Sequence, residues 1–329
     1  MNKPRLTPLT KKVAACLLKL VILGLAFYFI YRAVLKNMGS LQQFMVMVGH
    51  LNKRVVLAIM VIVVLLMIAN WLLESLKWRY ITKNLSPMTV WLAIESVFCG
   101  LTWAIFTPNR IGEYGGRIMF LPARKRIHGV LVMGVGAFGQ TLASCVLGAL
   151  SLTWFIYAYV HPNPWLMLCI FLVALAYVAL LTILYFDIKW LVSLLTRIKY
   201  VKKYHRFFDI ISRYKFSELL AIVGFSMARV LAFTIQYYLI IHLLVPQIPV
   251  HQIVLAMFAF YFVQSVIPSL DILDIGVRGF AADKIFGYIT NQHIAIIVAV
   301  SIIYIVNLII PAILGSVFVL KMKFFERAA

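Results

Sequence analysis

One short stretch of this otherwise apolar chain, residues 107–117, combines charged side chains with helix-breaking residues. It contains Pro108, Arg110, Glu113 and Arg117, together with three glycines. Proline removes a backbone donor and glycine permits irregular backbone, which survives at membrane depth only beside protein or water. Because guanidinium groups suit phosphate, the stretch predicts a broken-helix tip that receives an anionic headgroup. The alternative is an interfacial turn whose arginines anchor at lipid headgroups.

A second stretch of the same kind surrounds Pro268. Asp271, Asp274 and Arg278 follow this proline, with Gly276 between them. We predict a second tip that lines the same polar path, in which Arg278 contacts the headgroup. In this hypothesis Asp271, Asp274 or the carboxylate of the first stretch gates the path or couples it to protons.

Arg229 lies near the middle of the apolar run 217–243. A central arginine costs roughly 2.5–3.5 kcal/mol on membrane-insertion scales, so it requires a partner or a wet cavity. The expected partners are Glu95, Asp271, Asp274 or a lipid phosphate, and a structural ion pair is the alternative interpretation. For four other polar residues within apolar runs, hydrogen bonding between helices is the simplest prediction; they are Gln140, Gln236, Gln264 and Asn307.

These patterns predict a substrate-binding site and no catalytic one. The candidate substrate-binding residues are Arg110, Glu113, Arg117, Arg229, Asp271, Asp274 and Arg278. The seven histidines and four cysteines have no metal-ligand spacing, and the sequence has no phosphate-binding glycine loop or nucleophile elbow. We therefore expect no metal, no cofactor and no enzymatic activity. A membrane-embedded lipid transferase, with Glu113 or Asp271 as a base, is a weaker alternative.

The composition places these residues in a membrane protein. The chain is 64% hydrophobic and 12% charged, whereas a soluble domain carries about 25% charged residues. Its net charge of +21 results from 31 Lys and Arg against 10 Asp and Glu. The basic residues stand in short segments between apolar runs, where the positive-inside rule and anionic lipids account for them. Nucleic acid is therefore not an expected partner.

The apolar runs predict an all-α, polytopic fold with about six full spans. The candidate spans are 13–35, 55–76, 128–157, 165–186, 217–243 and 291–320. Two further apolar stretches, 88–106 and 251–267, end at proline and charge. They predict re-entrant hairpins over 88–123, entering from the cytoplasm, and 251–287, entering from outside, with eight full spans as the alternative.

Loop charge predicts the orientation. The connections at 158–164 and 244–250 contain no Lys or Arg, whereas 189–215 is strongly basic. By the positive-inside rule both termini are cytoplasmic, in a bacterial-type inner membrane. The basic residues of the loop at 36–54 do not fit this arrangement. The segment 189–215 itself has the alternation of basic and apolar residues of an amphipathic helix on the cytoplasmic leaflet.

The spacing of the spans indicates an internal repeat within a single membrane domain, residues 1–329. Pro108 and Pro268 are 160 residues apart. The same offset places the span 55–76, the hairpin 88–123 and the span 128–157 close to the span 217–243, the hairpin 251–287 and the span 291–320. The two units, 53–158 and 215–321, would have inverted topology, as in many secondary transporters.

The residues also resemble a known family. Pro108-Asn-Arg-Ile-Gly-Glu-Tyr-Gly-Gly-Arg117 resembles the Pro-x-Arg-x-Gly-Glu-x-x-Arg signature of the lysylphosphatidylglycerol synthase transmembrane-domain family, which is described as flippase-like. Ser265-Val-Ile-Pro268 and Gly276-Val-Arg278 resemble its second signature, although Asp271–Asp274 stands where a glycine pair is expected and Gly279 where a glutamate is expected. Leu76-Lys-Trp-Arg79 also looks like the family's sequence after the second span.

This resemblance implies a lipid flippase that moves a lipid or lipid-linked headgroup between leaflets. We expect no synthase domain here, so that a separate enzyme would synthesise the lipid. The expected ligands are membrane lipids, chiefly anionic phospholipid headgroups. The alternative function is a non-catalytic scaffold or partner subunit of an envelope-lipid synthesis complex, which the departures in the second signature favour.

Overall fold

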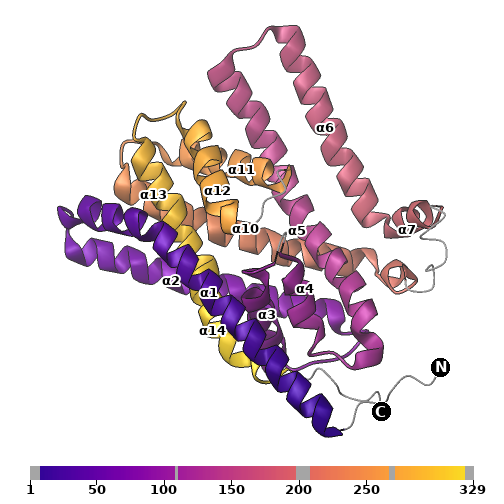
Figure 1. Cartoon of the computed structure of the whole chain (residues 1–329). Coiled ribbons are helices and arrows are strands. Elements are labelled where there is room, and N and C mark those ends of the chain that lie inside the picture. The colour runs from indigo at the N-terminus through magenta and orange to yellow at the C-terminus, as the bar shows by residue number, and fades with distance from the viewer. Residues whose placement is uncertain (1–7, 108–109, 198–207, 267–270, 323–329) are drawn as a thin grey trace.

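The computed structural model describes residues 8–107, 110–197, 208–266 and 271–322, and every regular element in these ranges is helical. The helices are α1 (Pro8–Gly49), α2 (Lys53–Thr82), α3 (Val90–Ala104), α4 (Ile111–Ile118), α5 (Arg126–Phe155), α6 (Pro164–Phe186), α7 (Ile188–Thr196), α10 (Phe216–Leu244), α11 (Val250–Val266), α12 (Asp271–Phe286), α13 (His293–Tyr304) and α14 (Ile310–Val319). Short turns of 3-10 or π-helix extend some of them: Ala123–Lys125, Ile156–Val160, Ile211–Arg213 and Ile305–Ile309. Figure 1 shows their arrangement.

Six helices in the described ranges are long and apolar enough to cross a membrane. They are Val13–Gly49, Lys53–Thr82, Ala123–Val160, Pro164–Phe186, Phe216–Leu244 and His293–Val319. An amphipathic soluble helix would expose polar residues, but these expose leucine, valine and phenylalanine instead. The chain is therefore a polytopic helical membrane protein, which confirms the predicted class and the predicted number of full spans.

The first helix is longer than predicted. We expected a loop over 36–54, but α1 continues to Gly49 because no proline interrupts this part of the chain. Asn37, Phe44 and Val48 are buried on its inner face. The loop between α1 and α2 is correspondingly short, and its basic residues Lys53 and Arg54 belong to the first turn of α2.

The two shorter apolar stretches form helical hairpins. α3 has 15 residues and α11 has 17, so at 1.5 Å per residue they are about 23 and 26 Å long, against a hydrocarbon core of about 30 Å. Each is followed by a helix that packs against it, α4 on α3 and α12 on α11. These lengths and contacts favour hairpins over an eight-span arrangement.

The hairpins pack crosswise. α3 contacts α14, α11 contacts α5, and α2 lies against α10. Glycines allow the two hairpin contacts, since a Cβ added at Gly315 of α14 would lie 2.0 Å from the Phe98 carbonyl oxygen, and one at Gly148 of α5 would lie 2.4 Å from Phe262 Cβ. Close approach at small residues is the usual way that membrane helices associate. Each hairpin thus packs on the last span of the other proposed repeat unit.

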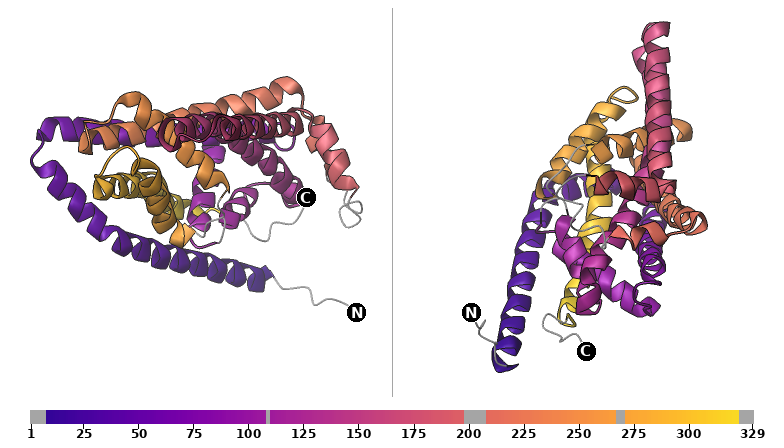
Figure 2. Two further views of the ribbon diagram at one scale, coloured as in Figure 1. Left: turned by 90° about the horizontal axis from the view of Figure 1, so that it is seen from above. Right: turned by 90° about the vertical axis from the view of Figure 1, so that its right-hand side faces the viewer.

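The helix boundaries also follow the predicted offset. α3 begins at Val90 and α11 at Val250, so the starts of these two helices are 160 residues apart. Inverted symmetry of the two units remains a prediction. Around this core, α13 and α14 lie between α1 and the remaining helices, and the α5–α6 pair extends outward as an arm (Figures 1 and 2).

Candidate functional site

The first hairpin is held closed by a threonine and by glycine packing. Thr107 Oγ1 donates to the Trp103 carbonyl at 2.9 Å and accepts from the Gly112 amide at 2.8 Å, which links the end of α3 to the start of α4. A Cβ at Gly116 would lie 2.6 Å from Gly100 Cα. We expected these glycines to form irregular backbone, and this is wrong: Gly112 and Gly116 are helical, and their function is close packing on α3.

Arg110 carries the unusual backbone instead. Its φ is 55°, in the left-handed region, where residues other than glycine are uncommon. It is the N-cap residue of α4, so this conformation sets the direction in which the helix leaves the turn. Arg110 Nη2 lies 3.0 Å from Glu113 Oε2, one helical turn further on.

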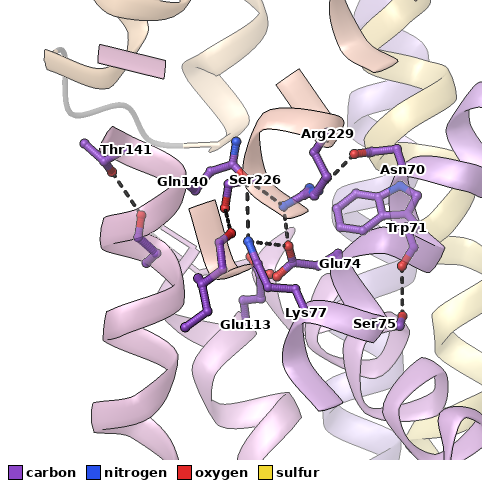
Figure 3. A network of polar contacts seen from close by, with 12 residues as sticks. Asn70, Trp71, Glu74, Ser75, Lys77, Glu113, Gln140, Thr141, Ser226 and Arg229 are labelled. Carbon is purple, nitrogen blue, oxygen red and sulfur yellow. Dashed lines mark hydrogen bonds and ion pairs between the residues drawn. The ribbon is translucent and has the colours of Figure 1, made fainter. Parts of the chain in front are cut away.

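A buried carboxylate, Glu74 of α2, is the centre of the polar network (Figure 3). Its two oxygens contact three cations: Lys77 Nζ at 2.8 Å from Oε2, Arg117 Nη1 at 2.7 Å from Oε1, and Arg229 Nη1 at Oε2. All four side chains are at most a tenth exposed. Arg117 extends from the last turn of α4 to Glu74. Its Nη2 also donates to Glu113, one turn earlier in the same helix.

Arg229 is fixed by neutral groups as well. Its Nε donates to Asn70 Oδ1 at 2.9 Å and its Nη1 donates to Gln140 Oε1 at 3.2 Å. The guanidinium also lies over the Trp71 ring, 5.3 Å from the ring centroid, which is within the range of a cation–π contact. The network therefore joins α2, α4, α5 and α10.

These residues line a cavity of about 580 Å³ in the described part of the chain. Its wall contains five basic side chains, Lys77, Arg110, Arg117, Arg229 and Arg278, and two acidic ones, Glu74 and Glu113. With all seven ionised, the wall carries a net charge of +3. Aromatic rings complete it; they are Trp71, Trp78, Tyr114, Phe233, Tyr237, Tyr261 and Tyr304. Excess buried positive charge is costly, so this wall suits an anionic ligand.

Several donors on residues of the cavity wall have no hydrogen-bond partner within the protein. They are Trp78 Nε1, Arg117 Nε and Gln264 Nε2. Buried polar groups are usually paired with protein or water, so these three donors are the incompletely paired part of the site. In the described residues, no group of three His, Cys, Asp or Glu side chains has the geometry to hold a metal ion.

The structure brings most of the predicted site residues together. Arg110, Glu113, Arg117, Arg229 and Arg278 all line the one cavity. The side chains of Asp271 and Asp274 lie outside the described residues. The expected pairing of Arg229 with Glu95 is wrong. Glu95 instead contacts Lys321, because α3 packs on the far end of α14, while Glu74 faces Arg229 across the α2–α10 contact.

Two central residues were missed from the sequence. Glu74 was not considered. Lys77, one residue beyond the predicted span 55–76, was expected in the cytoplasmic segment before the first hairpin, whereas it is 3% exposed within α2 and paired with Glu74. A carboxylate inside an apolar run is itself a signal of function. With the span predicted to end at 76, Glu74 stood two residues from its end, where charges are common. In the structure α2 continues for six more residues, to Thr82, so Glu74 is more than two turns from the end of the helix.

A second, neutral set of hydrogen bonds lies beside the first. Gln236 Nε2 donates to the Val63 carbonyl at 2.8 Å, and Asn307 Nδ2 donates to Gln236 Oε1 at 3.1 Å. Trp71 Nε1 donates to the Asn307 carbonyl at 3.1 Å. The predicted hydrogen bonding between helices is confirmed for Gln236 and Asn307. It is also confirmed for Gln140 of α5, whose Oε1 accepts from Arg229 of α10 and Lys77 of α2 within the charged network.

Comparisons with known protein families, with curated proteins and with solved structures found no match for this chain.

Proposed function

We propose that this polytopic membrane protein is a lipid flippase or related carrier that binds the anionic headgroup of a lipid in the cavity. The observation that carries the proposal is the cavity wall, whose described side chains have a net charge of +3 and come from long apolar helices and from both hairpins. Soluble anions and lipid headgroups share the chemistry that such a wall recognises. The apolar outer surface of the helices favours the lipid.

The depth of the site supports this proposal. Arg229 is 13 residues into α10, which corresponds to about 20 Å along the helix axis. A headgroup that crosses hydrocarbon loses its hydration, and an unpaired charge there is strongly penalised. Arginines at this depth would replace the lost water with charge-assisted hydrogen bonds to phosphate oxygens.

The two hairpins supply the second line of support. Arg110 and Arg117 come from the first hairpin and Arg278 from the second, and all three line the same cavity. In carriers built from inverted repeats, broken helices meet at a central site, and rocking of the units exposes it to each side in turn. The resemblance to the flippase-like family points to the same function, with the lipid supplied by a separate enzyme in the inner membrane.

The test is lipid movement in proteoliposomes with fluorescent anionic and zwitterionic lipids, comparing the wild type with Glu113→Gln. Glu113 holds Arg110 and Arg117 in place, so we expect movement to fall at least tenfold in the variant. Glu218→Gln is the matched control because Glu218 pairs with Lys83 outside the cavity, and it should retain wild-type movement.

No movement of any lipid by folded wild-type protein would contradict the proposal. The scaffold function would then be the better hypothesis, and a stable partner should co-purify. Equal rates of lipid movement in the wild type and in Glu113→Gln would show that Glu113 of the first hairpin does not take part in transport.

A further inference from the structure

The position of Glu74 differs from that of an ordinary ion-pair partner. Its Oε1 binds Arg117 and its Oε2 binds both Lys77 and Arg229. These cations come from α4, from α2 itself and from α10. One carboxylate thus supplies the anionic oxygens for three cations on three helices, at the wall of a cavity with room for a larger anion.

We infer that Glu74 is an internal counter-anion whose place among Arg117, Arg229 and Lys77 is taken by the phosphate of the arriving headgroup. The inference rests on the proposed function for the identity of the ligand. A phosphate diester carries one negative charge on two equivalent oxygens, as a carboxylate does, and guanidinium groups bind both in the same bidentate manner. The exchange moves ion pairs and breaks no covalent bond.

The hydrogen bonding of the cations favours exchange over a purely structural pair. Arg117 donates from Nη1 to Glu74 and from Nη2 to Glu113, while its Nε has no partner. A structural buried charge cluster is stable when all of its donors are satisfied. Here Arg117 keeps one donor unpaired while Glu74 is in place, so the cluster is not fully satisfied by its own carboxylates.

Exchange between Glu74 and the headgroup phosphate also explains how the headgroup is released. With Glu74 present, the three cations are never left without an anion, so the empty site avoids the full cost of buried unpaired charge. The same carboxylate competes with the headgroup and weakens its binding. Removing the carboxylate should therefore tighten binding and slow transport, whereas removing an ordinary binding group weakens both.

The experiment measures binding of short-chain phosphatidylglycerol, with short-chain phosphatidylcholine as the zwitterionic comparison, to purified wild type and Glu74→Gln. We expect the variant to bind the anionic lipid about 5-fold tighter or more, the scale of a coupling between competing sites, with unchanged binding of phosphatidylcholine and slower lipid movement. The control Glu218→Gln should bind as the wild type does. Inorganic phosphate, tested alongside, should bind far more weakly than the lipid; equal binding would overturn the assignment of a lipid headgroup.

A second pair of variants guards against misfolding. Glu74→Gln with Lys77→Gln removes one anion and one cation and so keeps the net charge of the cluster, and it should bind the anionic lipid tighter than Lys77→Gln alone. If the wild type binds and moves the lipid but neither comparison shows tightening, the exchange is overturned and the proposed function stands. If no protein binds or moves an anionic lipid, both are overturned.

Discussion

The two hairpins have the same architecture but place different chemistry at the cavity. The first, α3–α4, brings Arg110, Glu113 and Arg117 to the wall, next to Glu74 of α2. The second, α11–α12, contributes mainly uncharged groups among its described side chains, including Tyr261 and Gln264, with Arg278 as the basic exception; its lining residues are Tyr261, Gln264, Ser265 and Arg278.

This difference separates the framework from the binding site. Both hairpins begin at the same offset and pack crosswise on the far unit, so the geometry does not require charge. The ion pairs at the cavity gather around the first hairpin and at the α2–α10 contact, where Arg229 is the contribution of the second unit. The second unit otherwise contributes neutral hydrogen bonds, such as that between Gln236 and Asn307. We therefore expect substitutions in the first hairpin to affect binding and stability together, and those in the second to affect them less.

The largest expected effect is from Arg117→Leu. It removes one of the three cations that contact Glu74 and leaves Glu113 with only the partly exposed Arg110. Because breaking a buried ion pair costs about 3–5 kcal/mol, we expect a loss of up to that size, and the variant should abolish lipid movement. Arg278→Leu in the second hairpin is the comparison; because Arg278 is only partly buried, its loss of stability should be much smaller. Thermal unfolding in detergent measures both, and equal losses would contradict the proposed asymmetry.

A smaller effect is expected from adding one methyl group to each hairpin. Gly116→Ala places a Cβ 2.6 Å from Gly100 Cα, whereas Gly279→Ala on α12 meets its nearest atom at 3.6 Å, an ordinary contact. Overpacking costs about 1–3 kcal/mol, so Gly116→Ala should lower the unfolding temperature and Gly279→Ala should not. A neutral Gly116→Ala would show that α4 can move away from α3.

Gln236→Leu tests the neutral hydrogen bonds. It removes the bonds to the Val63 carbonyl and from Asn307, and interhelical hydrogen bonds in membranes contribute about 0.6 kcal/mol each on average. We expect a small loss of stability and unchanged affinity for short-chain phosphatidylglycerol. A large loss of affinity would mean that the neutral groups of the second unit bind the headgroup.

The smallest effect is expected from Lys83→Ala. Lys83 follows the last residue of α2 and pairs with Glu218 in the first turn of α10. Lys83 Nζ lies 2.8 Å from Glu218 Oε1, and exposed pairs contribute about 0.2–1 kcal/mol. The hydrogen bond to Glu218 raises the pKa of Lys83. The contribution is therefore complete below the unfolded-state pKa and is lost as pH rises through the folded-state value, so unfolding temperatures of wild type and variant should converge at strongly alkaline pH.

The sequence was sufficient for the class of fold and for the position of the hairpins. Runs of about 20 apolar residues are long enough to span a bilayer and must satisfy their own backbone as helices. The two shorter runs end at Pro108 and Pro268, where a helix is interrupted, so the sequence located the hairpins but left eight full spans as an alternative. Arg110, Glu113 and Arg117 were predicted together because they lie within eight residues of one another.

The long-range partners could not be predicted in the same way. Glu74 and Arg229 are 155 residues apart, and nothing in either helix alone specifies which face of α2 meets α10. Lys77, one turn from Glu74, has the flanking sequence of a loop charge and was assigned to the cytoplasm for that reason. Only the packing of α2 against α10 and α4 made it a buried partner of Glu74.

The sequence by itself determined the local properties of this protein: its helical class, the number of long apolar helices, the positions of the two hairpins and the excess of basic residues. These follow from hydropathy and backbone chemistry, which act over a few residues. The tertiary structure decided which charges meet, because an ion pair at membrane depth depends on the rotation and crossing of helices that are distant in the chain. Those crossings are set by side-chain shape at contacts such as Gly116 on Gly100.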